Sequence, residues 1–560
     1  MRYVRQGLIL WVTALFVSFT AWGQGGSGRA GRAGAAQPAG TPATAPASAP
    51  ATPAGRGGGG GRGTASSSEF YDYDTAAGTA MPVPDAPPAE TRQKIAVNGE
   101  ALAYTTRAGY MPLRNATTGQ SEAHLFYTSY SKDGVPDTAV RPLVFFLGGA
   151  PGAAASWQEF GGFGPKRMKW ASDGAAGLPP YGWVDNPGTL LGQADLVFVN
   201  PVGTAFSRPD QPGRGPGFWT TAGDIASLGE FVRSFLNTYN RRDSPLFLAG
   251  EDGGTARAAG LAAWLSEHQI PVHGVVLLSM TMAADAVAGD EQYMTLLPSL
   301  IMAAWYHKKL SPELTAMSAE QISGQARQFA SREYLHALYK GARMTAEERT
   351  RVVADLSRLT GLSQAFIVNN DLRIAPERFN AELLREQLRG LSNSDARVTG
   401  FLPGGGGGRG GFGGGFGGGA AAIDFNQSNL AGGFRTAYET YLRRELAFGG
   451  NSNGVFYLSG GGIGAFTATG SDDTSLAAAF ARNPSLRLFV GVNYFDLNAP
   501  FYAAEFTLAH LNVSPQVRAH NITVSYFEAG QMTYVDNKAL AKLQGELARF
   551  VSQATAPARQ

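Results

Sequence analysis

The architecture of this 560-residue chain is indicated most directly by the stretch Ser244-Pro-Leu-Phe-Leu-Ala-Gly-Glu-Asp-Gly-Gly-Thr255. An apolar run typical of a strand ends here in a turn of small residues, and residues 255–268 follow with the pattern of a helix. A Gly-x-X-x-Gly turn between a strand and a helix is typical of a nucleophile elbow, because small residues let the chain turn sharply and raise the central side chain above the sheet. The central residue of this turn is Asp252.

Short apolar runs alternate with helical patterns on both sides of this turn. Strands are predicted at residues 124–130, 143–147, 195–199, 245–249, 274–279, 486–492 and 522–527. Helices are predicted at residues 223–239, 255–268 and 536–553, the last with Asp536 as its cap. Several strands are apolar throughout, which is typical of strands covered on both faces. The alternation therefore predicts the α/β class, with a mostly parallel central sheet flanked by helices.

Composition divides the chain into five parts. We expect a signal peptide at residues 1–23, where Arg2 and Arg5 precede a short apolar run that ends in small residues. Residues 24–68 are rich in Gly, Ala and Pro and contain no acid, which predicts a disordered tether. The folded core is predicted at residues 69–288 and 436–560. A helical cap is predicted between these two parts, at residues 289–435, and it contains a glycine-rich loop at residues 404–419.

The glycine-rich loop has an alternative interpretation, as a linker between two independent domains. The strands predicted after residue 451 need the earlier strands as partners, which favours an insertion into one domain. Of the 74 glycines, about a third lie in this loop and in the tether. The rest of the chain therefore has the glycine density of an ordinary globular protein.

Charge and cysteine content exclude several classes of protein. The chain has no Cys, which excludes a disulfide scaffold, a thiolate zinc site and a thiol nucleophile. Its 46 Lys and Arg exceed its 44 Asp and Glu only because six Arg lie in residues 1–68, so the folded part is mildly acidic and no nucleic-acid partner is predicted. No cofactor and no metal site are expected, because His307 has no second ligand at metal-binding spacing and is expected to pack in the cap.

The N-terminal sequence also bears on where the protein acts. The apolar run at residues 7–19 is short for a membrane span, and no stop-transfer pattern follows it. We therefore expect an exported protein, periplasmic or extracellular, with no stable membrane span after signal cleavage. The alternative is an uncleaved N-terminal anchor.

Five further segments lie in a fixed order around the elbow. They are Phe145-Phe-Leu-Gly-Gly-Ala-Pro-Gly152, Asp195-Leu-Val-Phe-Val-Asn-Pro-Val-Gly-Thr-Ala-Phe-Ser207, Leu297-Pro-Ser-Leu-Ile-Met-Ala-Ala-Trp-Tyr-His307, Asn493-Tyr-Phe-Asp-Leu-Asn-Ala-Pro500 and Tyr526-Phe-Glu-Ala-Gly-Gln-Met-Thr-Tyr534. Together with the elbow, they resemble in the same order the motifs of the serine carboxypeptidases, peptidase family S10, and in particular of their secreted bacterial branch. The resemblance runs from about residue 126 to residue 551 and implies an α/β-hydrolase fold with a helical cap.

The resemblance places the catalytic positions at Asp252 for the nucleophile, Gln531 for the histidine and Asp496 for the acid. In a Ser-His-Asp mechanism the imidazole takes the proton from serine and later gives it to the leaving group. Gln531 has no titratable nitrogen and cannot act as that base, although its amide could bond Asp496. A carboxylate at position 252 adds negative charge where the oxyanion must form. Both substitutions therefore oppose peptidase chemistry.

The sites that surround the triad are altered as well. The resemblance places the oxyanion-hole region at three glycines, Gly148, Gly149 and Gly253. Ala150 is an extra residue in this loop, and an insertion displaces donors that must be placed accurately. Leu147 stands where the family has an Asn that helps hold the terminal carboxylate of the substrate, whereas Glu251, the other position of that carboxylate site, remains.

These substitutions predict an S10-like protein that has lost peptidase activity and binds a peptide, a protein C-terminus or another partner between cap and sheet. The expected signal peptide predicts that this protein is exported. A first alternative is an active hydrolase that uses Asp252 as an ester-forming nucleophile or recruits another residue such as Ser156. The Asp252 route would need a His to activate water on the ester. A second alternative is a structural protein of the cell envelope, in which Asp252 only caps the following helix. The ligand and the oligomeric state stay open.

Overall fold

The computed structural model describes residues 83, 86–97, 99–149, 153–170, 177–211, 213–285, 287–402, 424–449, 456, 458 and 473–555. All of them belong to one unit, Phe70–Gln560. The predicted signal peptide and tether at residues 1–68, and the glycine-rich loop at residues 404–419, lie outside the described residues. The fold below is therefore that of the predicted core and cap.

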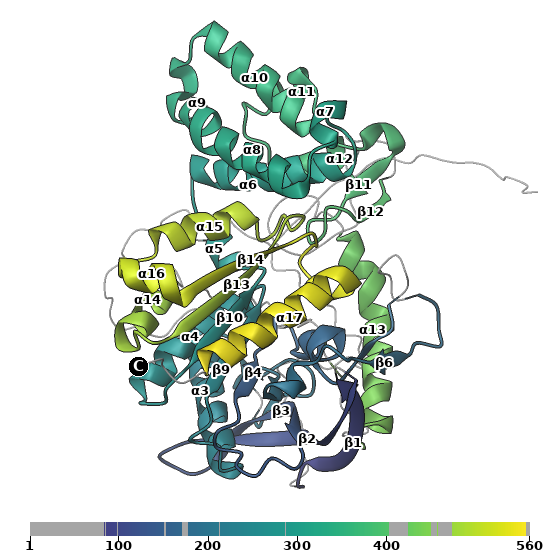
Figure 1. Cartoon of the computed structure of the whole chain (residues 1–560), viewed down its shortest axis with the longest axis vertical. Coiled ribbons are helices and arrows are strands. Elements are labelled where there is room, and N and C mark those ends of the chain that lie inside the picture. The colour runs from purple at the N-terminus through teal and green to yellow at the C-terminus, as the bar shows by residue number, and fades with distance from the viewer. Residues whose placement is uncertain are drawn as a thin grey trace, which may run out of the picture. The chain divides into compact units, whose positions relative to one another are not determined.

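A ten-stranded sheet forms the centre of the fold (Figure 1). Its strand order is β1-β2-β3-β7-β4-β9-β10-β13-β14, and β8 pairs with β3. The strands from β7 to β14 in this order run parallel, whereas β1, β2 and β3 are antiparallel additions at one side. The bounds are Ala89–Val97 (β1), Glu100–Arg114 (β2), Ser121–Lys132 (β3), Leu143–Phe146 (β4), Asp195–Val199 (β7), Arg208–Pro209 (β8), Leu246–Glu251 (β9), Gly274–Leu278 (β10), Arg487–Asn493 (β13) and Ile522–Phe527 (β14).

The predicted α/β class is confirmed, and each predicted strand has a counterpart in this sheet. The four central strands β7, β4, β9 and β10 are buried along their whole length, as continuous apolar runs predict. Strands β1 and β2 have no counterpart among the predicted strands. Two small antiparallel pairs complete the strands, and they are Lys166–Met168 (β5) with Trp183–Asp185 (β6), and Arg389–Leu391 (β11) with Thr399–Phe401 (β12).

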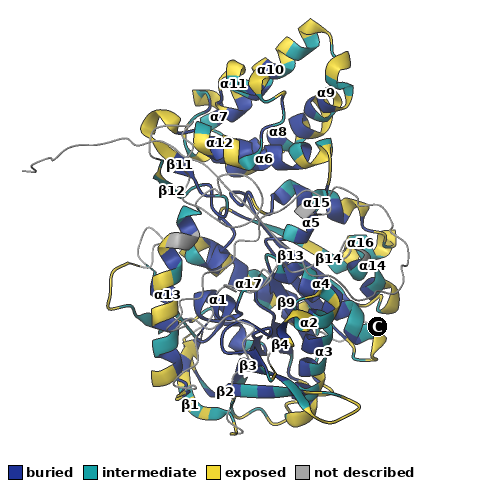
Figure 2. Cartoon of the chain, turned by 180° about the vertical axis from the view of Figure 1, so that it is seen from behind, coloured by how far each residue is buried: buried dark blue, intermediate teal, exposed yellow. Residues whose placement is uncertain are grey.

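Helices cover both faces of the sheet (Figures 1 and 2). Because successive strand residues point to opposite faces, Leu143 and Phe145 pack with α3 (Thr221–Thr238) and α4 (Gly254–Glu267), while Val144 and Phe146 pack with α13 (Phe425–Arg444) and α17 (Asn537–Ala554). The first of these faces also contacts α14 (Asp473–Arg482), α15 (Phe501–His510) and α5 (Thr281–Asp285). The shorter helical segments are Ser156–Gln158 (α1), the π-helix Glu159–Phe163 (η1), Leu190–Gly192 (η2), Gly215–Phe218 (α2), Pro515–Asn521 (α16) and Thr533–Val535 (η6).

The cap is helical, as predicted (Figure 1). It begins at α6 (Asp290–Tyr306), which packs against α15, and Arg327 of the cap forms paired hydrogen bonds with Glu505 of α15. Its other segments are Pro312–Thr315 (α7), Ala319–Phe329 (α8), Ala330–Tyr334 (η3), Leu335–Lys340 (α9), Gly341–Arg343 (η4), Ala346–Thr360 (α10), Gln364–Asn369 (α11), Pro376–Glu382 (α12) and Arg385–Gln387 (η5). The predicted end of the cap at residue 435 falls inside α13, whose buried Phe434 and Tyr438 pack with the core.

The strand β14 ends the strand order of the main sheet. Lys542 of α17 donates a hydrogen bond of 2.7 Å to the backbone carbonyl of Tyr526, and its ammonium group lies 5.1 Å from the ring centre of Phe527.

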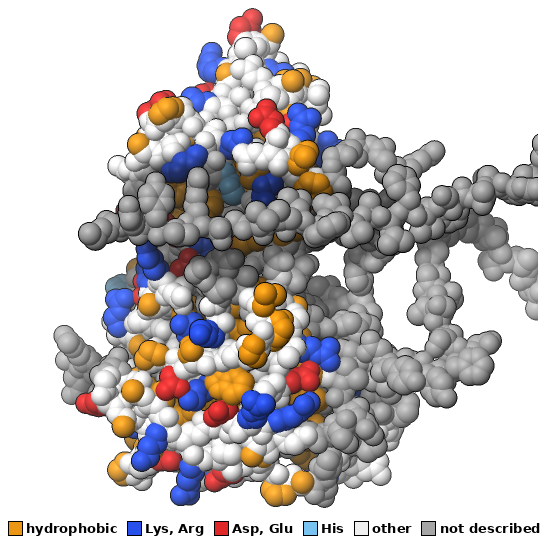
Figure 3. Space-filling view, turned by 90° about the vertical axis from the view of Figure 1, so that its right-hand side faces the viewer, with side chains coloured by type: hydrophobic (Ala, Val, Ile, Leu, Met, Phe, Trp, Pro, Cys, Tyr) orange, Lys and Arg blue, Asp and Glu red, His pale blue; other side chains and the backbone are white. Residues whose placement is uncertain are grey.

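On the face shown in Figure 3, basic and acidic side chains are interspersed. Within the described residues, no helix has both the length and the apolar composition needed to cross a membrane.

Candidate functional site

The strand β9 leads into α4 through a sharp turn at Asp252. Its φ of +55° is in the left-handed region, which a residue other than glycine adopts only at an energetic cost. The backbone N–H of Asp252 donates to the carbonyl of Leu278 at 2.9 Å, and its carbonyl accepts hydrogen bonds from the N–H and the hydroxyl of Thr255, at 3.0 and 2.6 Å. These bonds hold the strand–turn–helix geometry predicted from the sequence.

Two glycines make this turn sterically possible. A Cβ at Gly250 would lie 1.9 Å from the carbonyl oxygen of Gly254, and a Cβ at Gly254 would lie 1.9 Å from the carbonyl oxygen of Gly148. The start of α4 is thus packed directly onto the loop that follows β4. The N-cap of α4 is Gly253, which has no side chain to accept a hydrogen bond. The proposed capping role of Asp252 is therefore not that of the N-cap residue of this helix.

Asp496 follows β13, the neighbour of β10 in the sheet. Its Oδ1 accepts hydrogen bonds from the backbone N–H groups of Asn498 and Ala499, both at 3.0 Å. The side chain is completely buried, and its Oδ2 has no hydrogen-bond partner among the described residues. Burial, and to a smaller extent the negative charge of Asp252, raise the pKa of Asp496 to about 8.

Gln531 lies on the loop after β14, at the histidine position. Its Oε1 accepts a hydrogen bond of 3.4 Å from the side-chain amide of Asn498. Its backbone carbonyl accepts a hydrogen bond from the hydroxyl of Ser279 at 2.9 Å. From the sequence, the amide of Gln531 could form a hydrogen bond with Asp496. Instead, its amide oxygen is bonded to Asn498, and Oδ2 of Asp496 is left without a partner in the described part of the chain.

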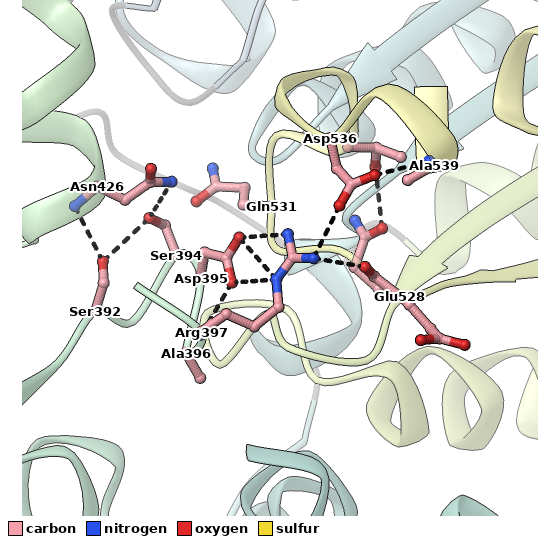
Figure 4. A network of polar contacts seen from close by, with 12 residues as sticks. Ser392, Ser394, Asp395, Ala396, Arg397, Asn426, Glu528, Gln531, Asp536 and Ala539 are labelled. Carbon is pink, nitrogen blue, oxygen red and sulfur yellow. Dashed lines mark hydrogen bonds and ion pairs between the residues drawn. The ribbon is translucent and has the colours of Figure 1, made fainter. Parts of the chain in front are cut away.

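The segment of the cap between β11 and β12 forms hydrogen bonds with the loop that contains Gln531 (Figure 4). The backbone N–H of Gln531 donates to the carbonyl of Ser394 at 2.6 Å. Arg397 bonds the carboxylate of Asp395 at 2.8 Å, the carboxylate of Asp536 at 3.1 Å and the backbone carbonyl of Glu528 at 2.8 Å. Both ends of the loop are thus attached to the cap.

Asp536 also has the role in α17 that the sequence predicts. Its Oδ1 accepts hydrogen bonds from the backbone N–H groups of Lys538 and Ala539, at 2.9 and 3.1 Å, so it is the N-cap of the helix. Its other carboxylate oxygen bonds Arg397. One side chain therefore connects the helix α17 to the cap.

Glu251 is buried beside Asp252. Its Oε2 accepts a hydrogen bond of 3.3 Å from the hydroxyl of Tyr534. Burial, then the charge of Asp252 and to a smaller extent that of Asp496, raise the pKa of Glu251 well above its usual range. Among the described residues, the charges that raise the pKa values of Glu251 and Asp496 belong to Asp252 and, for Glu251, also to Asp496. Leu147, at the position of the family's Asn, is completely buried and has no polar side-chain atom.

The loop after β4 contains Gly148 and Gly149 of the predicted oxyanion region. Gly148 donates its N–H to Oε1 of Gln158 at 3.1 Å, and Arg257 of α4 donates to the carbonyls of Leu147 and Gly149, both at 2.9 Å. Arg257 is also paired with Asp224 of α3 at 2.6 Å. Gln158, Arg257 and Asp224 belong to no motif that the sequence reveals. The predicted insertion at Ala150 lies outside the described residues.

Ser156 and His307 are two further residues considered in the sequence. Ser156 is completely buried in α1, and its hydroxyl has no hydrogen-bond partner among the described residues. Nε2 of His307 lies 2.7 Å from the carbonyl oxygen of Ala396, within the cap. In the described part of the chain, His, Asp and Glu form no group of three that could hold a metal ion.

The mostly parallel sheet, the elbow at its carboxyl edge and the helices on both faces define an α/β-hydrolase fold. The family model described as serine carboxypeptidase matches residues 97–374, and the chain belongs to this family. No curated protein sequence matches the chain significantly.

Solved structures to which the chain is similar include three enzymes. A prohormone-processing carboxypeptidase from Saccharomyces cerevisiae has 14% sequence identity and a TM-score of 0.46, over 80% of this chain and 91% of that chain. A monoglyceride lipase from Saccharomyces cerevisiae has 11% identity and a TM-score of 0.34, over 80% and 95%. A proline iminopeptidase from Mycobacterium smegmatis has 11% identity and a TM-score of 0.31, over 80% and 99%.

Proposed function

We propose that this protein is an exported serine carboxypeptidase homologue that has lost peptidase activity and binds a peptide or a protein partner between cap and sheet. The observation that carries the proposal is Asp252 in the left-handed turn of the elbow. In an elbow this turn presents the nucleophile, and here it presents a carboxylate next to buried Glu251. The residue that would have to accept its proton is Gln531.

Chemical reasons argue against peptide hydrolysis at this centre. An amide side chain cannot accept a proton at neutral pH, so Gln531 cannot serve as a general base. Asp496 bonds its own loop and would have no imidazole to orient. Negative charge on Asp252 would repel a developing oxyanion. Ser156 is buried in α1, so it is a poor substitute for the missing nucleophile.

Binding is supported by the parts of the site that are retained. The elbow, the Asp496 loop and the Gln531 loop all have well-bonded backbones, and the cap segment around Arg397 fixes the last of these. Such a preorganised framework is what a binding site needs to limit the entropy lost on association. Export is supported by the signal-like sequence at residues 1–23, and detection of a chain that lacks these residues in the periplasm or medium would test it.

Labelling with a fluorophosphonate probe tests the loss of serine hydrolase activity. We expect no labelling of the wild-type chain and no release of C-terminal residues from test peptides. The double variant Asp252→Ser with Gln531→His rebuilds the nucleophile and the base. Labelling of the double variant at position 252 would indicate that the two substitutions account for the loss. Labelling of the wild type at any serine would overturn the proposal.

The elbow position of Asp252 also favours one second candidate, catalysis through an ester on its carboxylate. That ester must be hydrolysed by activated water. The histidines closest in sequence to Gln531, His510 and His520, are exposed on α15 and α16. Turnover in water enriched in heavy oxygen would insert the label into Asp252 if this route operates. We expect no incorporation, and incorporation would replace the binding proposal by the hydrolase.

A further inference from the structure

We propose that a pocket between the cap and the end of strand β14 binds a small zwitterion, a free amino acid or a short peptide with unmodified termini. The pocket has a volume of about 850 Å³, within the usual range of about 300–1,000 Å³ for ligand sites. None of the residues that line it stands at a predicted triad position. The inference goes beyond the proposed function and does not depend on it.

The walls of the pocket come from both the cap and the core. Its cap side carries Glu320, Arg327 and Arg397, and its core side carries Tyr526, Glu528 and Lys538. The cap residues belong to α8 and to the segment between β11 and β12, while the core residues belong to β14, to the loop that follows it and to the first turn of α17. A ligand bound here would therefore contact both parts of the fold.

Arg327 is held in a fixed orientation on the cap side of the pocket. Its guanidinium forms paired hydrogen bonds with Glu505, at 2.7 to 3.0 Å, and bonds the hydroxyl of Ser323 at 3.0 Å. It also lies 4.8 and 5.1 Å from the ring centres of Phe501 and Tyr526. Glu505 and Ser323 engage three of its five N–H donors. The hydroxyl of Tyr526 also interacts with this group, so at least one donor remains for the carboxylate of a ligand.

The second cation of the cap side is already engaged. Arg397 bonds the carboxylates of Asp395 and Asp536 and the backbone carbonyl of Glu528, at 2.8, 3.1 and 2.8 Å. In Figure 4 the carboxylate of Glu528 points away from Arg397, although its carbonyl accepts a bond from it. The side chain of Glu528 is thus not part of this network.

Three charged side chains of the pocket have no hydrogen-bond or ion-pair partner among the described residues. They are the ammonium group of Lys538 and the carboxylates of Glu320 and Glu528, and all three residues are exposed. A ligand with one ammonium and one carboxylate group can pair with charges of both signs. A ligand with a single charge leaves one sign without a partner, so the pocket favours a zwitterion.

Aromatic side chains supply the apolar part of the wall. The rings of Tyr494 and Tyr526 are stacked with their centres 5.8 Å apart and their planes at 20°, and Phe527 and Ala539 line the same pocket. Aromatic surfaces of this kind pack well against an aromatic or apolar side chain. Phenylalanine is therefore a suitable probe of the site.

Five probes built on phenylalanine separate the charges of the ligand. Phenylalanine and Gly-Phe carry both an ammonium and a carboxylate group. Phenylalanine amide carries only the ammonium group, acetyl-phenylalanine carries only the carboxylate group, and acetyl-phenylalanine amide is neutral. Titration calorimetry on the full chain at pH 7 measures their dissociation constants. The comparison of phenylalanine with Gly-Phe distinguishes a free amino acid from a short peptide as the source of the zwitterion.

We expect phenylalanine, Gly-Phe or both to bind about 5-fold or more tightly than each of the other three probes, since an ion pair of partly exposed groups contributes up to about 1 kcal/mol. Lys538→Gln should reduce the advantage over phenylalanine amide about 3-fold. The double variant Glu320→Gln with Glu528→Gln should reduce the advantage over acetyl-phenylalanine by a similar factor. The backbone bonds of Lys538 to Asp536 and of Arg397 to the carbonyl of Glu528 do not involve the substituted groups.

Lys94→Gln and Glu100→Gln are the matched controls and should keep both advantages, because both residues are exposed and neither lines the pocket. Binding of phenylalanine and Gly-Phe that is no tighter than that of the other probes would overturn the inference, as would the absence of binding by both. An unchanged advantage in the Lys538 variant or in the double variant would contradict the assignment to this pocket. Labelling by the fluorophosphonate probe would contradict the proposed function alone, so the two failures are distinguishable.

Discussion

Asp496 has two different carboxylate oxygens, one bonded to its own loop and one buried without a described partner. Its pKa of about 8 means that the folded state favours the protonated form, since the unfolded group titrates near 3.8. The stabilisation is fully present below about pH 4 and is lost as the pH rises through about 8. Near neutral pH this group is therefore protonated in the unliganded fold.

Asp496→Asn should remove this part of the pH dependence. The amide keeps the acceptor for Asn498 and Ala499 and has no charge to desolvate. We expect the variant to gain stability relative to the wild type between pH 5 and pH 9, by about 1.4 kcal/mol for each pKa unit that the group is raised, as an upper limit. Urea unfolding at the two pH values measures the difference. An unchanged difference between variant and wild type would contradict the assigned ionisation, with Asp355→Asn as the control.

At the scale of elements, the ion pair of Arg257 and Asp224 joins α4, α3 and the loop after β4. Both side chains are buried, and Arg257 also bonds two carbonyls of the loop. Arg257→Met should destabilise the fold by about 3–5 kcal/mol, because it leaves the carboxylate of Asp224 buried without its cation. Urea unfolding measures this loss.

The double variant Arg257→Met with Asp224→Leu provides the control for that prediction. Removing both charges avoids the unpaired carboxylate, so the double variant should recover most of the stability lost in Arg257→Met. Additive losses from the two substitutions would show that the pair is not coupled. In that case the contacts of Arg257 with the two loop carbonyls would account for its effect.

A second element-scale feature attaches α13 to the sheet. Glu159 of the π-helix η1 is completely buried and accepts hydrogen bonds from Tyr130 of β3 at 2.5 Å and from Tyr438 of α13 at 2.6 Å. Burial raises the pKa of Glu159 to about 7, while these hydroxyl groups act to lower it. This carboxyl group, which connects η1, β3 and α13, therefore changes its charge near neutral pH.

Tyr438→Phe should destabilise the fold by about 1–3 kcal/mol, and by more at pH 8.5 than at pH 5.5, because a hydrogen bond to an ionised carboxylate is stronger. Thermal or urea unfolding at the two pH values tests this. Tyr104→Phe is the matched control, since Tyr104 is also buried but donates to the neutral amide oxygen of Gln93 at 2.8 Å. A loss in Tyr438→Phe that is equal at both pH values would argue against ionisation of Glu159 in this range.

The sequence predicted elements best where burial alone determines their pattern. The strands β4, β7, β9 and β10 are covered on both faces, so their sequences are apolar throughout. Strand β1 carries Glu90, Arg92 and Lys94 on its exposed positions and is formed by pairing with β2, a contact that local pattern does not reveal. Helix α13 was divided by the predicted cap boundary because its packing partners lie far away in the sequence.

For the candidate site, too, only the parts that lie within contiguous motifs could be predicted from the sequence. The elbow and the three predicted triad positions are carried by contiguous motifs, and Asp252, Asp496 and Gln531 follow the strands β9, β13 and β14. The contacts of Arg257 and Arg397 join segments more than a hundred residues apart, such as Arg257 with Leu147 and Arg397 with Asp536. A single sequence contains no local signal for such pairs. The orientation of the Gln531 amide toward Asn498 likewise depends on the folded loops.

For the molecule as a whole, buried acids determine how stability responds to pH. Burial raises the pKa values of Glu159, Asp224, Glu251 and Asp496. Each group contributes stability below its unfolded pKa near 4 that is lost as the pH rises through its folded value, about 7 for Glu159 and about 8 for Asp496. We therefore expect a lower melting temperature at pH 9 than at pH 5.5. Calorimetry at constant ionic strength measures it, and a melting temperature that rises over this range would contradict the prediction.

The ammonium group of Lys542 at the carbonyl of Tyr526 has a consequence for contacts with other molecules. The last strand of an open sheet presents backbone groups on which a foreign strand can assemble, and a lysine placed there opposes such assembly. A strand laid along β14 would have to displace the ammonium group from this carbonyl and desolvate its charge. The outer edge of β14 is thereby protected against strand-by-strand aggregation.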